Sequence, residues 1–343
     1  MDVAVTGAAG HVGGNLVRAL LEEGRSVRVL VRNDTRAIDG LDVEIVRGDV
    51  LDPAALKKLF RGVRTAYHAA GKISIMTSHD AEVLRTNIEG ARNVAEACLA
   101  CGVGRLVHFS SIHAFCSDPG GEMITEEREL VSRSDFCYDR SKAAGQREVL
   151  KGVARGLDAV IVNPTGIIGP IDYKPSRMGE TLLDIYHSRL PALIDGGYNW
   201  VDVRDVVQGA IAAERKGRTG ECYLLAGHWK SIADIAETVT AVSGIRTPRL
   251  VTPLWLCAGV SHVSQLYSKV TNTSAKFTPY AIKTLRRHRH ISHSKAGKEL
   301  GYRPRPFEET IRDTLMWFDG IPDPGSVARA VNRAAGGTVL SRR

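Results

Sequence analysis

The sequence has no hydrophobic run long enough to cross a membrane. Its longest apolar stretches, such as residues 254–260 (LWLCAGV), fall well short of the ~20 residues that a transmembrane helix needs. The first residues, MDVAVTG, already have the composition of a strand, which leaves no room for the charged and apolar regions of a secretory leader. We therefore expect no membrane association and a cytoplasmic location.

The sequence also lacks a recognisable cysteine motif. Its six cysteines are scattered, with neither the spacing of a secreted disulfide framework nor a second pair to complete a zinc site. We therefore expect reduced thiols and no bound metal.

Aromatic residues do not alternate with basic residues in the way that base stacking requires. The net charge of +8 is concentrated in residues 283–305, which carry eight Lys or Arg and one Glu, and in residues 323–343, which carry four Arg and one Asp. The remainder is slightly acidic. A local basic segment fits an anionic small molecule or a solvated face, so we expect no nucleic-acid partner.

Short β-branched segments alternate with amphipathic segments through the first half of the chain. This rhythm predicts an α/β protein with a Rossmann-type, doubly wound parallel sheet. Pro and Gly then punctuate the sequence, and a smaller, mostly helical C-terminal lobe is expected, helical from about residue 231 to residue 318. The predicted division is a sheet domain over 1–165 with 198–226 returning to it, a lobe over 166–197 and 227–322, and a disordered tail over 323–343.

Residues 6–13, TGAAGHVG, place three glycines between the first predicted strand and the first helix. Gly7 allows the tight turn, Gly10 lets backbone N–H groups approach a pyrophosphate, and Gly13 lets the helix pack close to the strand. The context predicts a dinucleotide-binding loop, with an ordinary strand-to-helix turn as the alternative. The expected cofactor contacts in this loop are Thr6, Gly7, Ala9, Gly10, His11, Val12 and Gly13.

The end of the second predicted strand decides between NAD and NADP. An acidic residue there would bind the ribose hydroxyls of NAD, whereas a basic residue would accept the 2′-phosphate of NADP. The chain has Arg32, with Arg36 nearby, which favours NADP and leaves NAD and a plain surface arginine as alternatives. Asp49 and Val50 are placed to meet the adenine, although Asp49 could instead cap the helix that begins at Pro53.

Tyr138 and Lys142 are four residues apart in a predicted helix and therefore share one face. A free phenol has a pKa near ~10, and the Lys cation together with an oxidised nicotinamide would lower the pKa of Tyr138. Tyr138 could then exchange a proton with a carbinol oxygen, while Lys142 donates to the nicotinamide ribose. Taken alone, a Tyr and a Lys four residues apart are common on solvent-exposed helices and do not indicate a catalytic site.

A serine segment earlier in the chain strengthens the interpretation of Tyr138 and Lys142 as catalytic residues. Ser111 follows a buried strand at the carboxyl edge of the sheet, where ligands bind, and can hydrogen-bond the same substrate oxygen. Ser110 is expected to bond to local backbone instead. The three predicted catalytic residues are Ser111, Tyr138 and Lys142.

These elements resemble the extended short-chain dehydrogenase/reductase superfamily, also called the NAD-dependent epimerase/dehydratase superfamily, to about residue 320. The glycine spacing, HAA at 68–70, SSIHAF at 110–115 and NPTGIIGP at 163–170 are similar to its segments. Arg32 and SSIHAF look most like the dihydroflavonol 4-reductase and 3β-hydroxysteroid dehydrogenase branch. The resemblance implies the catalytic roles above and adds further cofactor contacts: Ala69, Ala70, Asn87, Tyr138, Lys142, Asn163 and Pro164.

Substrate contacts are harder to predict. His113, two residues beyond Ser111, could reach and tune the substrate pocket or be an ordinary loop histidine. The resemblance places the other candidates around the substrate, although each also suits surface or lobe packing. The six candidates are Lys72, His113, Tyr173, Arg177, Met178 and Tyr198.

The leading hypothesis is an NADP-dependent oxidoreductase that interconverts a carbonyl and an alcohol on a small organic substrate. The alternative is an NAD-dependent sugar-nucleotide epimerase or dehydratase, which residues 283–305 keep open because a nucleotide diphosphate needs cations. A dinucleotide sensor without catalysis is disfavoured, since a sensor needs no proton donor. The expected partner is thus a small carbonyl, alcohol or sugar nucleotide, and a homodimer is left open.

Overall fold

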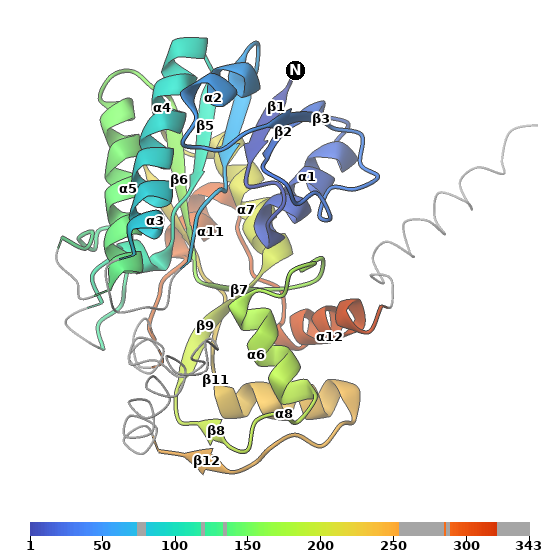
Figure 1. The fold of residues 1–343 in the computed structure, drawn as a ribbon. Coiled ribbons are helices and arrows are strands. Elements are labelled where there is room, and N and C mark those ends of the chain that lie inside the picture. The colour runs from blue at the N-terminus through green and yellow to red at the C-terminus, as the bar shows by residue number, and fades with distance from the viewer. Residues whose placement is uncertain (74–79, 118–120, 133–135, 254–284, 286–288, 321–343) are drawn as a thin grey trace, which may run out of the picture.

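A parallel sheet of seven strands forms the centre of the protein (Figure 1). The computed structural model describes residues 1–73, 80–117, 121–132, 136–253, 285 and 289–320. The strand order is β10-β6-β5-β4-β1-β2-β3, so the direction of winding reverses between β1 and β4. The strands are β1 (Val3–Thr6), β2 (Val27–Val31), β3 (Glu44–Arg47), β4 (Thr65–His68), β5 (Arg105–Phe109), β6 (Ala159–Pro164) and β10 (Cys222–Leu225).

Helices cover both faces of this sheet. One apolar core joins the sheet to α1 (His11–Glu22), α7 (Val203–Lys216) and α11 (Ser294–Leu300). A second core on the opposite face joins it to α2 (Pro53–Phe60), α4 (Gly90–Cys101) and α5 (Cys137–Val153). The central strands β1, β4, β5 and β6 are buried on both sides, whereas the edge strand β3 is largely exposed. The predicted Rossmann-type fold is confirmed.

A smaller lobe lies beyond the carboxyl edge of the sheet (Figure 1). Its own core brings together side chains of its helices and short strands. The helices are α6 (Arg177–Tyr186), α8 (Ile232–Ser243) and α12 (Phe307–Phe318). The strands form a three-stranded sheet of β11 (His228–Ser231), β9 (Gly197–Asp202) and β7 (Gly166–Ile168), and a two-stranded sheet of β12 (Val251–Thr252) and β8 (Leu193–Ile194).

Two expectations for this region need correction. Residues 198–226 were expected to return to the large sheet; β10 joins it and α7 packs on it, but β9 pairs with β7 and β11 instead. The backbone beyond residue 231 is not helical throughout, because β12 pairs with β8. Residues 254–260 and 323–343, which include the expected tail, lie outside the described residues.

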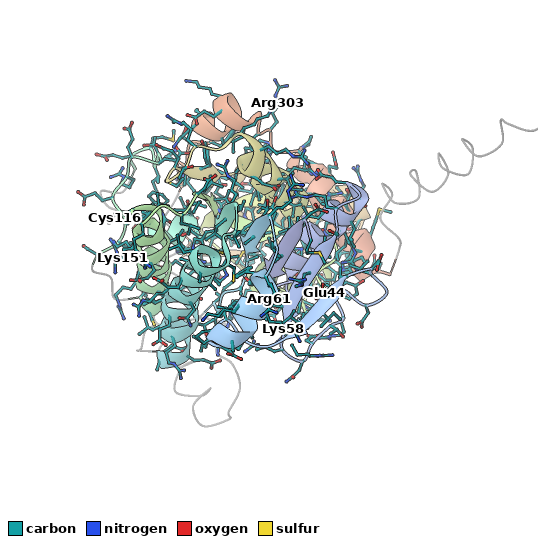
Figure 2. All side chains as sticks on the ribbon, turned by 90° about the horizontal axis from the view of Figure 1, so that it is seen from above. Glu44, Lys58, Arg61, Cys116, Lys151 and Arg303 are labelled. Carbon is teal, nitrogen blue, oxygen red and sulfur yellow. The ribbon has the colours of Figure 1, made fainter. Side chains whose placement is uncertain are left out.

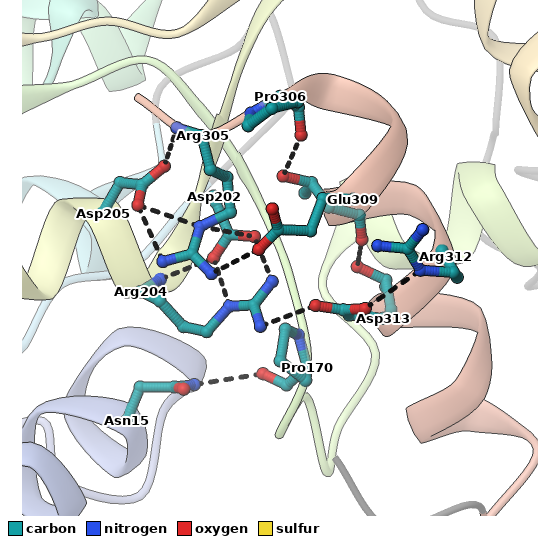
Figure 3. A network of polar contacts seen from close by, with 12 residues as sticks. Asn15, Pro170, Asp202, Arg204, Asp205, Arg305, Pro306, Glu309, Arg312 and Asp313 are labelled. Atoms are coloured by element: carbon teal, nitrogen blue, oxygen red, sulfur yellow. Dashed lines mark hydrogen bonds and ion pairs between the residues drawn. The ribbon is translucent and has the colours of Figure 1, made fainter. Parts of the chain in front are cut away.

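Ion pairs join α7 to the end of the described chain (Figure 3). Arg204 donates to Asp202 and to Asp313 of α12, with both contacts at 2.8 Å. Arg305 lies beside it and contacts Asp205 at 2.8 Å. Asp202 caps α7, and Asp205 in the first turn of α7 anchors Arg305.

Charged side chains are spread around the surface of the described part of the chain. Seen from above, Arg303 lies at one edge of the molecule, and Lys58 and Arg61 lie over the other half, inside the outline (Figure 2). No helix in the described ranges is both long and apolar enough to span a membrane. Within those same ranges, no three or more His, Cys, Asp or Glu side chains are grouped so that they could hold a metal ion.

Candidate active site

The glycine loop between β1 and α1 is shaped by two positions that have no space for a side chain. Gly7 has a φ of 77°, and a Cβ there would lie 2.5 Å from the backbone nitrogen of Ala70. A Cβ at Gly13 would lie 2.0 Å from the carbonyl oxygen of Gly7. These contacts press the first turn of α1 against the loop and the end of β4. The glycines are therefore required by close backbone approach.

The N-terminus of α1 fits a diphosphate group. Gly10 is the N-cap residue, and neither a capping side chain nor an acidic residue satisfies the first turn. The first N–H groups of a helix, here those of His11, Val12 and Gly13, have no partner within the helix and attract anions. The exposed Gly10 leaves this turn accessible, because a Cβ there would meet only the Gly7 carbonyl at 3.3 Å. These residues fit a dinucleotide.

Thr6 and Ala9, the two other predicted residues of the loop, have different surroundings. The side chain of Thr6 is buried, and its Oγ1 lies 2.7 Å from Nδ1 of His68 and accepts a bond from the Ala70 backbone at 3.4 Å. Thr6 therefore ties β1 to the end of β4. Ala9 is half-buried in the turn. A direct cofactor contact from either residue stays a prediction.

At the end of β2, Arg32 has an accessible guanidinium. Its side chain is 74% exposed, and Nη1 lies 3.6 Å from the Asp49 carboxylate. Arg36 instead donates to Asp34 at 2.7 Å, and this bond lowers the pKa of Asp34 to about 2. Asp49 does not cap α2, because Asp52 occupies the cap position and accepts from Ala54. Arg32 is thus the better placed of the two arginines for a phosphate.

The expected adenine and nicotinamide contacts lie along the same edge of the sheet. Val50 is buried after β3, next to Gly90 of α4. Ala69 and Ala70 follow β4 and form the wall behind Gly7. Asn163 and Pro164 end β6. The carboxyl ends of the parallel strands place all these residues along one edge of the sheet.

Asn87 lies in a π-helical turn, η1 (Arg85–Glu89), between α3 (Ala81–Leu84) and α4. Its side chain donates to the Lys72 carbonyl and to Ser141, each at 2.9 Å, and accepts from the Lys72 N–H at 2.8 Å. Asn87 therefore fastens the loop after β4 to α5. The π turn, a feature often found at functional sites, was not predicted from the sequence.

Ser111, Tyr138 and Lys142 meet at the carboxyl end of β5. Ser111 caps the 3-10 turn η2 (Ile112–Ala114), and its side chain is hydrogen-bonded to that of Tyr138. Tyr138 and Lys142 lie one turn apart on α5, as expected. The Lys142 ammonium donates to the Phe109 carbonyl at 2.9 Å. The fold therefore assembles the three predicted side chains, although their catalytic roles stay predictions.

Burial shifts the pKa of both ionisable groups of this set. Burial raises the pKa of Tyr138 to about 12, the Ser111 hydrogen bond opposes this rise, and the Asp139 carboxylate adds to it. Burial also lowers the pKa of Lys142 to about 8. In the protein without cofactor, burial thus outweighs the help that a nearby ammonium can give, and the expected lowering of the pKa of Tyr138, which includes an oxidised nicotinamide, stays a prediction.

A buried polar layer beneath Lys142 was missed from the sequence. His68 and His108 are paired across β4 and β5, with ring centroids 5.1 Å apart. Burial and the Lys142 charge lower the pKa of His68 to about 3, and burial, His68 and Lys142 hold the pKa of His108 well below its usual value. Both imidazoles are thus neutral. The sequence contained a signal for this layer. Residues two positions apart in a strand share one face, so Leu106, His108 and Ser110 all point to the same side of β5.

Ser110 and Asn163 complete this layer. The Ser110 hydroxyl was expected to bond to local backbone, but it is buried without a hydrogen-bond partner in the described structure. The Asn163 amide donates to the Ser111 carbonyl at 3.0 Å and to Gln146 at 2.9 Å, and no partner is described for its own oxygen. Buried polar atoms of this kind are usually satisfied by a ligand or a water. They fit a cofactor whose amide end lies at this edge.

The six candidate substrate residues are dispersed. The His113 ring lies against Tyr138, with centroids 5.5 Å apart. Lys72 forms an ion pair with Glu82. The remaining four line the smaller lobe or its junction: Tyr173, Arg177, Met178 and Tyr198.

Tyr173 lies away from the catalytic candidates. Its ring packs against Trp317 at 5.0 Å, and its hydroxyl accepts from Arg18 of α1 at 3.3 Å. Met178 and Tyr198 lie on either side of Gly166, and burial raises the pKa of Tyr198 to about 12. Arg177 begins α6. Only His113 is placed next to the predicted catalytic residues.

A doubly wound sheet with a glycine loop after its first strand defines an NAD(P)-dependent enzyme of the short-chain dehydrogenase/reductase type. The profile of the NAD dependent epimerase/dehydratase family matches residues 3–226. The chain belongs to this family. The resemblance stated from the sequence motifs is thereby confirmed.

Similar proteins span nearly the whole chain. Sterol demethylase protein B of Methylococcus capsulatus is 35% identical over 93% of this chain and 98% of its own length. A putative dihydroflavonol 4-reductase of Synechocystis is 32% identical over 92% of this chain and 93% of its own length. A nucleoside-diphosphate-sugar epimerase from Pseudomonas aeruginosa has a similar fold, with a TM-score of 0.76, 22% identity and coverage of 93% and 98% of the two chains.

Proposed function

We propose that this enzyme interconverts a carbonyl and an alcohol on a small organic substrate, with NADPH as the reductant. The observation that carries the proposal is a half-buried Tyr138 phenol, hydrogen-bonded to Ser111 and one helical turn from Lys142. With its pKa raised to about 12, Tyr138 is a phenol at neutral pH and therefore a proton donor. Two relatives named as a dihydroflavonol 4-reductase and a sterol demethylase protein support a substrate of this class.

A bound nicotinamide supplies or accepts the hydride. Tyr138 donates its proton to the substrate oxygen, where negative charge develops, and Ser111 donates a hydrogen bond to the same oxygen. Lys142 keeps most of its charge at neutral pH, since its pKa is about 8. Its ammonium holds the cofactor ribose and favours the phenolate that remains after proton transfer. In alcohol oxidation the same groups act in reverse.

The preference for NADP rests on Arg32. Replacing Arg32 with Asp should weaken NADPH binding by about tenfold or more, since a hydrogen bond between charged groups contributes about 1.5–3 kcal/mol. NADH binding should change less, because NADH has no 2′-phosphate. Fluorescence titration of both cofactors measures the two dissociation constants.

The matched control is Arg61→Asp, which makes the same charge change at an exposed residue after α2. It should leave both dissociation constants near those of the unaltered protein. Equal weakening of NADPH and NADH in Arg32→Asp would remove Arg32 from cofactor selection.

The sugar-nucleotide alternative has less support. It depended on free cations in residues 283–305, yet Lys295 is bonded to Glu221 and the Cys222 carbonyl, and Arg305 is held by Asp205. Lys283, Arg286 and Arg287 lie outside the described residues. The similarity to the epimerase structure is a similarity of fold, and it does not indicate which substrate this protein uses.

A substrate screen tests the proposal directly. Purified protein is mixed with NADPH or NADH and with panels of ketones, aldehydes and sugar nucleotides, and absorbance at the reduced-nicotinamide band is followed. We expect carbonyl compounds to consume NADPH. A protein that keeps nicotinamide tightly bound and converts only sugar nucleotides, without net cofactor consumption, would instead be an epimerase or dehydratase.

A further inference from the structure

Asp139 is a buried carboxylate directly beside Tyr138, and the mechanism above does not use it. It lies in the first turn of α5 and is only 3% exposed. An acidic side chain is favourable at the start of a helix, but an exposed carboxylate would serve the helix equally well. Burial of a carboxylate costs free energy unless hydrogen-bond donors surround it. The position therefore calls for a role beyond helix stability.

His113 links this carboxylate to the other groups of the site. Its Nδ1 lies 3.2 Å from Oδ1 of Asp139. Its ring packs edge-on against the Tyr138 ring, with centroids 5.5 Å apart and an interplanar angle of 61°. Its backbone N–H donates to the Ser111 hydroxyl at 3.2 Å. One residue thus contacts Asp139, Tyr138 and Ser111 at once.

We propose that Asp139 and His113 act as a positioning pair, in which His113 orients the Tyr138 ring and the Asp139 carboxylate keeps Tyr138 a phenol ready to donate its proton. Asp139 fixes the His113 imidazole, and the imidazole in turn supports the Tyr138 ring. The backbone bond from His113 occupies a lone pair of the Ser111 oxygen, so the Ser111 hydroxyl is oriented toward Tyr138 and the substrate. This inference rests on the proposed reductase function.

The negative charge of Asp139 also favours the protonated form of Tyr138. The titratable groups around the Tyr138 ring in the described structure are Asp139 and Lys142 of α5 and His113 of η2, with the neutral His68 and His108 beneath Lys142. A phenolate at Tyr138 would be repelled by the Asp139 carboxylate, so the carboxylate raises the pKa of Tyr138. Removing that charge must lower this pKa.

The test is a titration of Tyr138 that needs no substrate. Absorbance at the tyrosinate band is followed from neutral to alkaline pH with NADP⁺ bound, and the Tyr138→Phe protein is subtracted to isolate Tyr138. In Asp139→Asn we expect the midpoint to fall by about one pH unit. Lys142 does not absorb at this band, so its own titration does not obscure the result. The alkaline limb of the reduction rate should move to lower pH with the same variant.

Two further variants make the test decisive. Glu148→Gln removes one charge from the same helix at a residue that pairs with Arg92 and Lys151, and should leave the midpoint unchanged. His113→Phe keeps a ring against Tyr138 but loses the donor to Asp139, so the midpoint should rise and kcat should fall several-fold with NADPH affinity retained.

An unchanged or raised midpoint in Asp139→Asn, or a lowered one in His113→Phe, would overturn the proposal. If Asp139→Asn does not fold, His113→Phe decides alone, and an unchanged midpoint there counts against the pair. Failure of the reductase function would appear separately, because the titration requires no turnover.

Discussion

Replacing Tyr138 with Phe should lower kcat for carbonyl reduction by about 10²–10⁴-fold. The substitution removes the hydroxyl that is hydrogen-bonded to Ser111 and that donates the proton in the proposed mechanism, but it keeps the half-buried ring. NADPH affinity should stay within about twofold, because the Phe ring still fills the space of the Tyr138 ring and the other expected cofactor contacts are unchanged. Steady-state kinetics together with a cofactor titration separate the two quantities.

Tyr186→Phe is the matched control for this experiment. Tyr186 also loses a hydrogen-bonded hydroxyl, since it donates to Asp319 at 2.8 Å, but it lies on the lobe surface away from Ser111. Its kcat should be close to that of the unaltered enzyme. Turnover that survives in Tyr138→Phe would show that another group supplies the proton, and the proposed role of Tyr138 would be wrong.

The second large effect is expected from Gly13→Ala. The added Cβ would lie 2.0 Å from the Gly7 carbonyl oxygen, a backbone atom that no side-chain rotation can move. The start of α1 must therefore shift away from the loop, which should lower the free energy of unfolding by about 1–3 kcal/mol. The displaced N–H groups should also weaken NADPH binding by about tenfold or more. Thermal unfolding with and without NADPH measures both changes.

Gly297→Ala is the control for the glycine experiment. Gly297 is also a helical glycine, in α11, but a Cβ there would meet its nearest neighbour, the Tyr302 carbonyl, at 3.6 Å. This variant should be slightly more stable, by up to about 1 kcal/mol, because Ala favours a helix over Gly. Normal NADPH binding in Gly13→Ala would contradict the assignment of this loop to the cofactor.

Local patterns in the sequence predicted the fold class and the groups that face the sheet edge. The alternation of strands and helices is a periodicity of neighbouring residues, and the spacing of Tyr138 and Lys142 follows from the helical turn. Gly7 and Gly13 could be recognised because the tight strand-to-helix turn tolerates few other residues. Parallel strands present their carboxyl ends at one edge, which places Ser111 beside the other two.

Contacts between distant segments could not be predicted in this way. Tyr173 was expected near the substrate, yet it packs between Arg18 and Trp317, a residue more than a hundred positions later. Residues 199–202 have the composition of a strand, but composition does not say which sheet a strand joins. Arg305 looked available for an anion until Asp205 was found beside it.

The sequence by itself determined that this protein carries a glycine loop and a Tyr, Lys and Ser set on a doubly wound sheet, because those features depend on neighbouring residues and on rules common to parallel sheets. Only the tertiary structure decided the protonation of the set. The pKa of Tyr138 rises and that of Lys142 falls because packing takes both partly out of water, and the Asp139 carboxylate adds to the rise for Tyr138. Burial is a property of the assembled fold, and it holds the proton on Tyr138 more firmly at neutral pH.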